Sequence, residues 1–179
     1  MSIDSEKDLT GLMKIGRIVA MAMRHMQEQM EPGMTTAELD AIGADFLKQH
    51  GARSAPILAY QFPGHTCISI NDEAAHGIPG PRVIQEGDLV NIDVSAELDG
   101  YWADTGATTP VPPITAEQQQ LCDHTKLALE RATSIMERSS MLVFITWDLC
   151  ALSAAIFFSR VSEMSTNICG SKFWVVGPS

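Results

Sequence analysis

The chain has 179 residues and a mass of 19.4 kDa, a length that suits one domain with a substantial hydrophobic core. Hydrophobic residues make up 45% of the sequence and the mean hydropathy is +0.04, which excludes a disordered chain. The formal net charge is −10 and no lysine- or arginine-rich stripe is present, so we expect no nucleic-acid binding, whereas a cation or a free amine would suit the charge.

Two helices are predicted at the start of the chain. Residues 9–30 place apolar side chains at three- and four-residue steps, and a Pro-Gly pair at 32–33 ends the pattern. Thr35 and Glu38 have the spacing of a capping box that starts a second helix, which Gly51 closes. Because strand-like segments follow, we expect an α+β domain.

The middle of the chain is predicted to be mostly loop. Residues 52–65 read as a loop, 66–70 as a short strand, and 71–81 as irregular because they are rich in turn formers. His76 lies in the last segment. A loop histidine suits a general acid–base or hydrogen-bonding role, but an ordinary surface histidine has the same signature.

The most informative stretch is 89–111, which predicts a β-hairpin. Apolar residues alternate with polar ones along its first half, and Asp99-Gly100 is the residue pair that a two-residue type I′ turn favours. This turn would place Ser95 opposite Asp104. Asp93 would then share a face with Asp104, with the two backbone positions about 7–8 Å apart.

Two carboxylates that converge on an apolar hairpin repel each other unless a cation lies between them. Oxygen ligands suit Mg, Mn, Ca, Fe(II), Co or Zn. Asp93 and Asp104 are therefore candidate metal ligands. The alternative is that both are solvated on an open sheet face or cap nearby backbone, and a register slip of one residue would separate them.

The remaining signals concern a third helix and the cysteines. Thr115 with Gln118 predicts another helix start after the prolines that end the hairpin. The cysteines have no metal-binding or redox spacing, and the first ten residues resemble no signal or transit peptide. We therefore expect free thiols in the cytoplasm, at Cys67, Cys122, Cys150 and Cys169.

A series of motifs between about Asp8 and Met136 resembles the type I methionine aminopeptidases. These motifs are Phe62-Pro63, Cys67-Ile68-Ser69-Ile70-Asn71, His76-Gly77-Ile78-Pro79, Glu86-Gly87-Asp88, Asn91-Ile92-Asp93-Val94 and Gly100-Tyr101-Trp102-Ala103-Asp104-Thr105. The related creatinases and prolidases share the aspartate pair, whereas the cysteine strand and the His-Gly-Ile-Pro motif favour the aminopeptidase branch.

The resemblance implies a pita-bread fold with two divalent metal ions, of which Co, Mn, Fe, Zn and Ni are the candidates. It implies that Asp93 binds one metal and Asp104 bridges both. It assigns His76 to catalysis and substrate binding, and it assigns Cys67, Tyr60 and Phe62 to an apolar substrate pocket. The implied activity is removal of the initiator methionine from nascent proteins.

The resemblance stops at about residue 136, so we divide the chain into an aminopeptidase-like half, 1–136, and a divergent apolar tail, 137–179. The family takes a histidine and two glutamates from its second half, but this sequence has no histidine after His124. A changed reading frame or a truncated gene product is the explanation we favour. A new partner-recruiting element is a second, and a membrane segment at 141–158 a third.

A membrane segment is the least favoured of these explanations, because Asp148 near the centre of the apolar stretch would cost about 2.5–3.5 kcal/mol on insertion. Two functions remain open. The first is a metalloaminopeptidase of low activity, monomeric, acting on N-terminal methionine peptides and working near the ribosome. The second is a non-catalytic remnant that binds peptides or proteins.

Overall fold

The structure is a computed structural model, and it describes residues 3–139. Its helices and strands follow one another as α1 (Glu6–Gln29), α2 (Thr36–Gln49), β1 (Arg53–Ser54), α3 (Ala55–Tyr60), β2 (Cys67–Ile70), β3 (Leu89–Leu98), β4 (Tyr101–Pro110) and α4 (Ala116–Ser139). The predicted α+β domain is confirmed over this range. The tail segment 141–158 and the cysteines at 150 and 169 lie outside the described residues.

Side-chain caps fix the starts of the long helices. At α2 the capping box is complete, because the amide of Glu38 donates to Thr35 Oγ1 at 3.2 Å and the amide of Thr35 donates to Glu38 Oε2 at 2.8 Å. The same pair of hydrogen bonds starts α4: the amide of Thr115 donates to Gln118 Oε1 at 2.8 Å, and the amide of Gln118 donates to Thr115 Oγ1 at 3.2 Å. Both predicted helix starts are confirmed.

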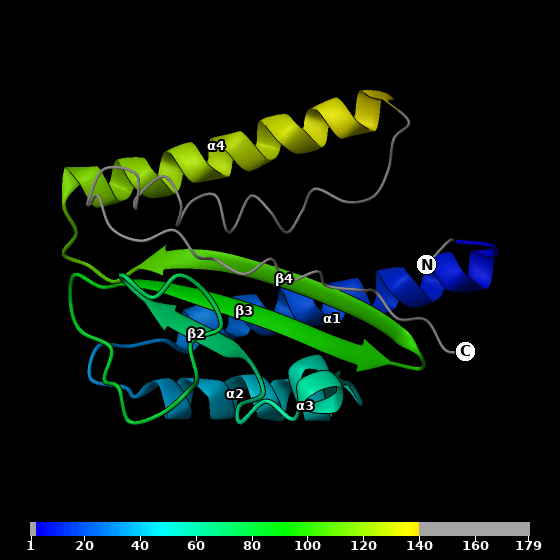
Figure 1. The fold of residues 1–179 in the computed structure, drawn as a ribbon, viewed down its shortest axis with the longest axis horizontal. Helices are drawn as coiled ribbons and strands as arrows, with labels where there is room; N and C mark the ends of the chain where they lie inside the picture. The colour runs from blue at the N-terminus through cyan, green and yellow to red at the C-terminus, as the bar shows by residue number, and fades with distance from the viewer. Residues whose placement is uncertain (1–2, 140–179) are drawn as a thin grey trace.

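The four strands form one antiparallel sheet with β3 in its centre. β4 pairs with one edge of β3 along all ten residues, whereas β2 and β1 share the other edge (Figure 1). The hairpin is thus the longest element of the sheet, and every other strand is placed relative to it.

One face of the sheet is covered by helices and forms the core. Figure 1 shows α1 crossing behind the strands, with α2 along the lower side. The apolar side chains that alternate along β3, among them Val90, Ile92 and Val94, are fully buried on this face. They pack against α1 residues such as Ile15 and Met26. The alternate residues of β3 therefore project from the opposite face of the sheet.

One segment differs from the prediction. Residues 55–60 were expected to be loop but form α3. Pro56 sits in the first turn of this helix, where a missing amide hydrogen removes no helical bond, and Gln61 ends the helix at φ 54°. Six residues are too few to show a helical repeat in the sequence. Within the described range, no helix is both long and apolar enough to cross a membrane.

Candidate metal centre

The hairpin has the predicted register. Leu98 faces Tyr101 across the turn and Ser95 faces Asp104. The turn residues Asp99 and Gly100 have φ of 55° and 87°, the positive values that a type I′ turn requires. Because residues two apart in a strand share a face, Asp93 and Asp104 project from the same side of the sheet, away from the core.

The two carboxyl groups interact directly. Burial, followed by the charge of Asp104 and a hydrogen bond with it, raises the pKa of Asp93 from 3.8 to about 8. Ser95 Oγ donates a hydrogen bond of 2.6 Å to Asp104 Oδ1. Asp93 is partly buried and Asp104 is exposed, and the raised pKa of Asp93 favours its protonated form near neutral pH.

This arrangement fits a divalent cation. A cation between the carboxylates would offset the repulsion that raises the pKa of Asp93, and it would meet hard oxygen ligands there. Gly106 is the cross-strand partner of Asp93, and a Cβ at this position would lie in ordinary van der Waals contact with the Asp93 Cβ, at 3.7 Å. Within residues 3–139, no group of three histidine, cysteine, aspartate or glutamate side chains gathers as a metal site.

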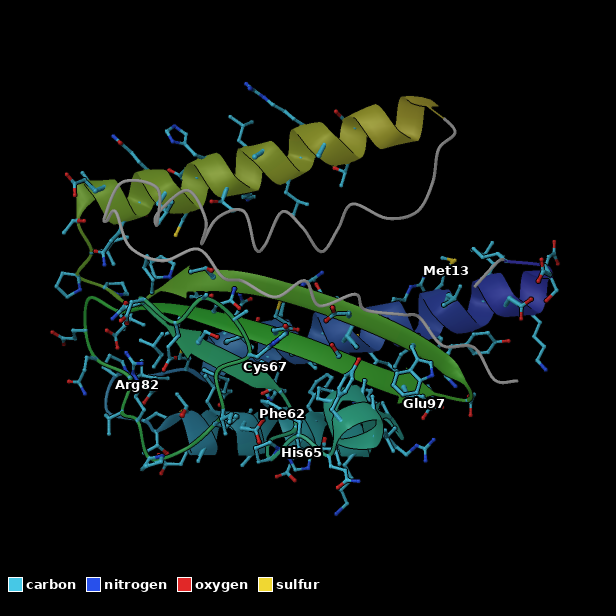
Figure 2. The ribbon with its side chains drawn as sticks, in the orientation of Figure 1. Met13, Phe62, His65, Cys67, Arg82 and Glu97 are labelled. Atoms are coloured by element: carbon cyan, nitrogen blue, oxygen red, sulfur yellow. The ribbon has the colours of Figure 1, made fainter. Side chains whose placement is uncertain are left out.

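Cys67 lies on β2 (Figure 2), and it is the cross-strand partner of Asp93 in the register of β2 with β3. It is buried, with 7% of its surface exposed. Burial first, and then the charges of Asp93 and Asp104, raise the pKa of its thiol to about 12. The thiol is therefore neutral in the metal-free chain, which suits an apolar wall rather than a nucleophile.

His76 lies in the loop that covers the other edge of β2. The Ile68 amide donates to the Gly77 carbonyl at 3.0 Å, and the Gly77 amide donates to Ser69 Oγ at 3.1 Å. A side chain on Gly77 would collide with the Ile68 carbonyl, so only glycine permits this close approach. His76 itself is exposed and has φ of 55°, a left-handed conformation held by the docked loop.

The same loop is tied down at two further places. Gly80 and Thr36, the first residue of α2, exchange hydrogen bonds of 2.9 and 3.1 Å. Closer to the ends of the loop, Arg82 Nη1 lies 2.6 Å from Glu73 Oε1. The position of His76 is thus set by contacts to both β2 and α2.

The two predicted pocket aromatics lie at the end of α3. Tyr60 is its last residue and is 61% exposed, and Phe62 follows the left-handed Gln61 and is partly buried. The structure thus brings Asp93, Asp104 and Cys67 together on one face. Tyr60, Phe62 and His76 come from neighbouring segments, and the roles of all six residues remain predictions.

Sequence reasoning missed Asp40, a buried carboxylate on α2. It accepts hydrogen bonds of 2.7 Å from both the amide and the hydroxyl of Thr66, and it also accepts one of 3.1 Å from the His65 amide. These bonds fix the residue that precedes Cys67. Its signal was available in the sequence, because Asp40 falls on the buried stripe of α2 between Thr36 and Leu47.

Comparisons with known proteins agree with this geometry. The family model described as metallopeptidase family M24 matches residues 10–143. Methionine aminopeptidase of Staphylococcus epidermidis is 50% identical over 133 residues, covering 74% of this chain and 53% of that protein. Methionine aminopeptidase 2 of Bacillus subtilis is 47% identical over 132 residues, with 73% and 53% covered.

Solved structures give the same result. Methionine aminopeptidase from Rickettsia prowazekii superposes with a TM-score of 0.68 at 33% identity, covering 73% of this chain and 52% of that one. The enzyme from Thermotoga maritima superposes with a TM-score of 0.70 at 28% identity, with 74% and 53% covered. The chain spans about half the length of the curated relatives it matches. It has the corresponding half of the pita-bread fold, and it belongs to metallopeptidase family M24.

Proposed function

We propose that this chain supplies half of the active site of a metal-dependent aminopeptidase that removes N-terminal methionine from nascent proteins. The observation that carries the proposal is the convergence of Asp93 and Asp104 on one face of the hairpin, where burial and mutual repulsion favour a cation. The relatives named methionine aminopeptidase supply the substrate class.

In this proposal Asp93 would be a ligand of one divalent metal ion, and Asp104 would be a ligand of both ions. Co, Mn, Fe, Zn and Ni are the candidates, since carboxylate ligands alone select only weakly among divalent ions. When bound, such ions polarise the scissile carbonyl and activate water. The Ser95 hydroxyl, which donates to Asp104 Oδ1, orients that carboxylate.

The remaining proposed residues act on the substrate. Cys67, Phe62 and Tyr60 form the walls of a pocket for the unbranched thioether side chain, where a neutral thiol adds no charge. The His76 imidazole donates a hydrogen bond to the substrate carbonyl as negative charge develops there. We also propose that the reaction takes place in the cytoplasm near the ribosome and that the chain acts as a monomer.

The 179-residue chain alone is proposed to have low activity. Two carboxylates offer at most four ligand oxygens, and a second metal ion would have no ligand of its own from residues 3–139. The sequence after His124 holds no histidine that could complete the set. Slow turnover of a Met-Gly peptide is therefore expected, and turnover near about 10 s⁻¹, the ordinary rate of an enzyme, would contradict this.

Titration of the metal-free chain with Mn(II) tests the site itself. We expect saturable, stoichiometric binding with a dissociation constant of about 10⁻⁴–10⁻³ M, the range of weak oxygen-ligand sites. Asp104→Asn should abolish it. Asp99→Asn is the matched control, because it removes the same charge from the exposed turn of the same hairpin and keeps a residue that tolerates positive φ.

The result also separates the two functions. Binding that is lost in Asp104→Asn but kept in Asp99→Asn supports the metallopeptidase. Binding lost equally in both variants indicates a general effect of the negative charge and contradicts a specific site. Absence of saturation at about ten times the expected dissociation constant favours the alternative, a non-catalytic module that binds peptides or proteins.

A further inference from the structure

Glu97 is a buried acid that the proposed chemistry does not use. It is only 4% exposed, although it lies next to the exposed turn of the hairpin that carries Asp93 and Asp104 (Figure 2). It shares the face of β3 with Ser95 and Asp93, because the three residues are spaced two apart. A buried carboxylate is costly unless all its oxygens are paired, so its partners indicate its role.

Both carboxylate oxygens of Glu97 are engaged, and they join three segments of the chain. Oε1 accepts a hydrogen bond of 2.7 Å from the amide of Gly100, the second turn residue. Oε2 accepts from Arg53 of β1, at 2.8 Å from Nε and 2.7 Å from Nη2. Arg53 is also the cross-strand partner of Glu97. One side chain therefore fixes β1, the end of β3 and the turn into β4.

The bond to Gly100 matters because the turn sets the register of the hairpin. A slip of one residue would move Asp104 to the core face and leave Asp93 without its partner. The other contact of the turn is weak, since the ion pair between Lys14 and Asp99 spans 3.3 Å and both side chains are more than half exposed. The bonds that Glu97 accepts from Gly100 and Arg53 are shorter, at 2.7–2.8 Å, and the Glu97 side chain itself is buried.

We infer that Glu97 is a positioning residue for the metal centre: by binding the Gly100 amide and Arg53, it holds the hairpin in the one register that sets Asp104 beside Asp93. This inference rests on the proposed function for its consequence, metal binding. Its structural content, the fixed register, can be measured without any metal.

The first test uses the unmodified, metal-free chain and hydrogen exchange of the Gly100 amide. Gly100 is exposed at the tip of a turn, where an unbound amide exchanges freely. We expect protection of about tenfold or more, as for a charge-assisted hydrogen bond of ordinary strength. Exchange at the rate of an unstructured glycine would overturn the inference, and this measurement requires no variant to fold.

The second test compares Glu97→Thr with Glu97→Gln. Threonine favours a strand but cannot reach the Gly100 amide, whereas the glutamine carbonyl can replace Oε1. In Glu97→Thr we expect weaker nuclear Overhauser contacts between Ser95 and Asp104, and an Mn(II) affinity lowered about tenfold, the factor that corresponds to one lost hydrogen bond. Glu97→Gln should keep the contacts and remain within about threefold of the parent affinity.

Asp99→Asn again serves as the control, because it perturbs the same turn without touching Glu97. Unchanged Ser95–Asp104 contacts in Glu97→Thr would overturn the inference, as would equal losses in Glu97→Thr and Asp99→Asn. A parent chain that binds no Mn(II) would refute the proposed function instead. In that case the Gly100 exchange and the cross-strand contacts still decide the role of Glu97.

Discussion

Asp93 should make the metal-free chain less stable as the pH rises, and Asp93→Asn should remove that dependence. Burial and the charge of Asp104 raise the pKa of Asp93 from 3.8 to about 8. A carboxyl group whose pKa is higher in the folded state favours folding fully below the unfolded value, and that contribution is lost as the pH approaches the folded value. The contribution of Asp93 to the free energy of unfolding is therefore lost between about pH 4 and about pH 8.

The size of the effect follows from the pKa difference. One pKa unit corresponds to about 1.36 kcal/mol, and the full difference sets an upper limit of roughly 5–6 kcal/mol. Asp93 keeps some contact with solvent and shares its charge with Asp104. We therefore expect a loss of roughly 2–3 kcal/mol in the free energy of unfolding between about pH 5 and pH 8.

Urea unfolding in the presence of EDTA measures this loss across the window. At about pH 7.5 the metal-free Asp93→Asn variant should be more stable than the parent, and its own stability should vary less with pH. Asp99→Asn should follow the parent, because Asp99 is exposed. The reasoning is refuted if the parent and Asp93→Asn lose stability in parallel, since the dependence would then come from other groups.

A bound metal ion should restore part of the stability that the chain loses as the pH rises. It binds only the deprotonated pair, so Mn(II) at ten times its dissociation constant should raise the free energy of unfolding by about 1.4 kcal/mol at pH 7.5. In Asp93→Asn the same addition should have no effect. Stabilisation of equal size in both proteins would place the metal at another site.

Three further predictions concern the elements that hold the site. Gly11→Ala should lower the free energy of unfolding by about 1–3 kcal/mol, because a Cβ at this position collides with the Tyr101 ring. Gly16→Ala on the same helix has open space around it and should raise the free energy of unfolding by about 0.5–1 kcal/mol. Equal shifts of the two variants in urea unfolding would contradict this packing. Gly77→Ala should displace the loop that carries His76 and lower the affinity for a methionine peptide in calorimetry, while leaving Mn(II) affinity intact. Thr35→Ala should lower the free energy of unfolding by about 1 kcal/mol through loss of the capping box, and an unchanged melting temperature would show that the box contributes nothing.

Local chemistry explains which parts of this structure could be predicted. The Asp99-Gly100 turn and the alternation along β3 act within a few residues, and so do the caps at Thr35 and Thr115. Each signal therefore specified its element without knowledge of the rest of the chain. The hairpin register followed from one turn, and with it the convergence of the two aspartates.

The contacts that escaped prediction link distant residues. Glu97 and Arg53 are 44 positions apart, and Asp40 and Thr66 are 26 apart. Nothing in the local sequence of either pair names its partner, since the pairing depends on how α2, β1 and β2 pack. Helix α3 was missed for a different reason, because its six residues are shorter than the repeat that reveals a helix.

The same distinction between local and distant contacts explains why the two aspartates can be well placed although the proposed metal site has no further ligands among residues 3–139. Asp93 and Asp104 sit on adjacent strands joined by a two-residue turn, so their mutual position is fixed by short-range bonds within the hairpin, with Glu97 tying that turn to β1. A complete coordination sphere is a long-range property, because its ligands must come from segments that meet only after the whole fold has packed. The raised pKa of Asp93 is the physical consequence, because the hairpin brings the two carboxyl groups together whether or not the remaining ligands are supplied. The unfavourable energy of that pair is then the part of the structure that metal binding would relieve.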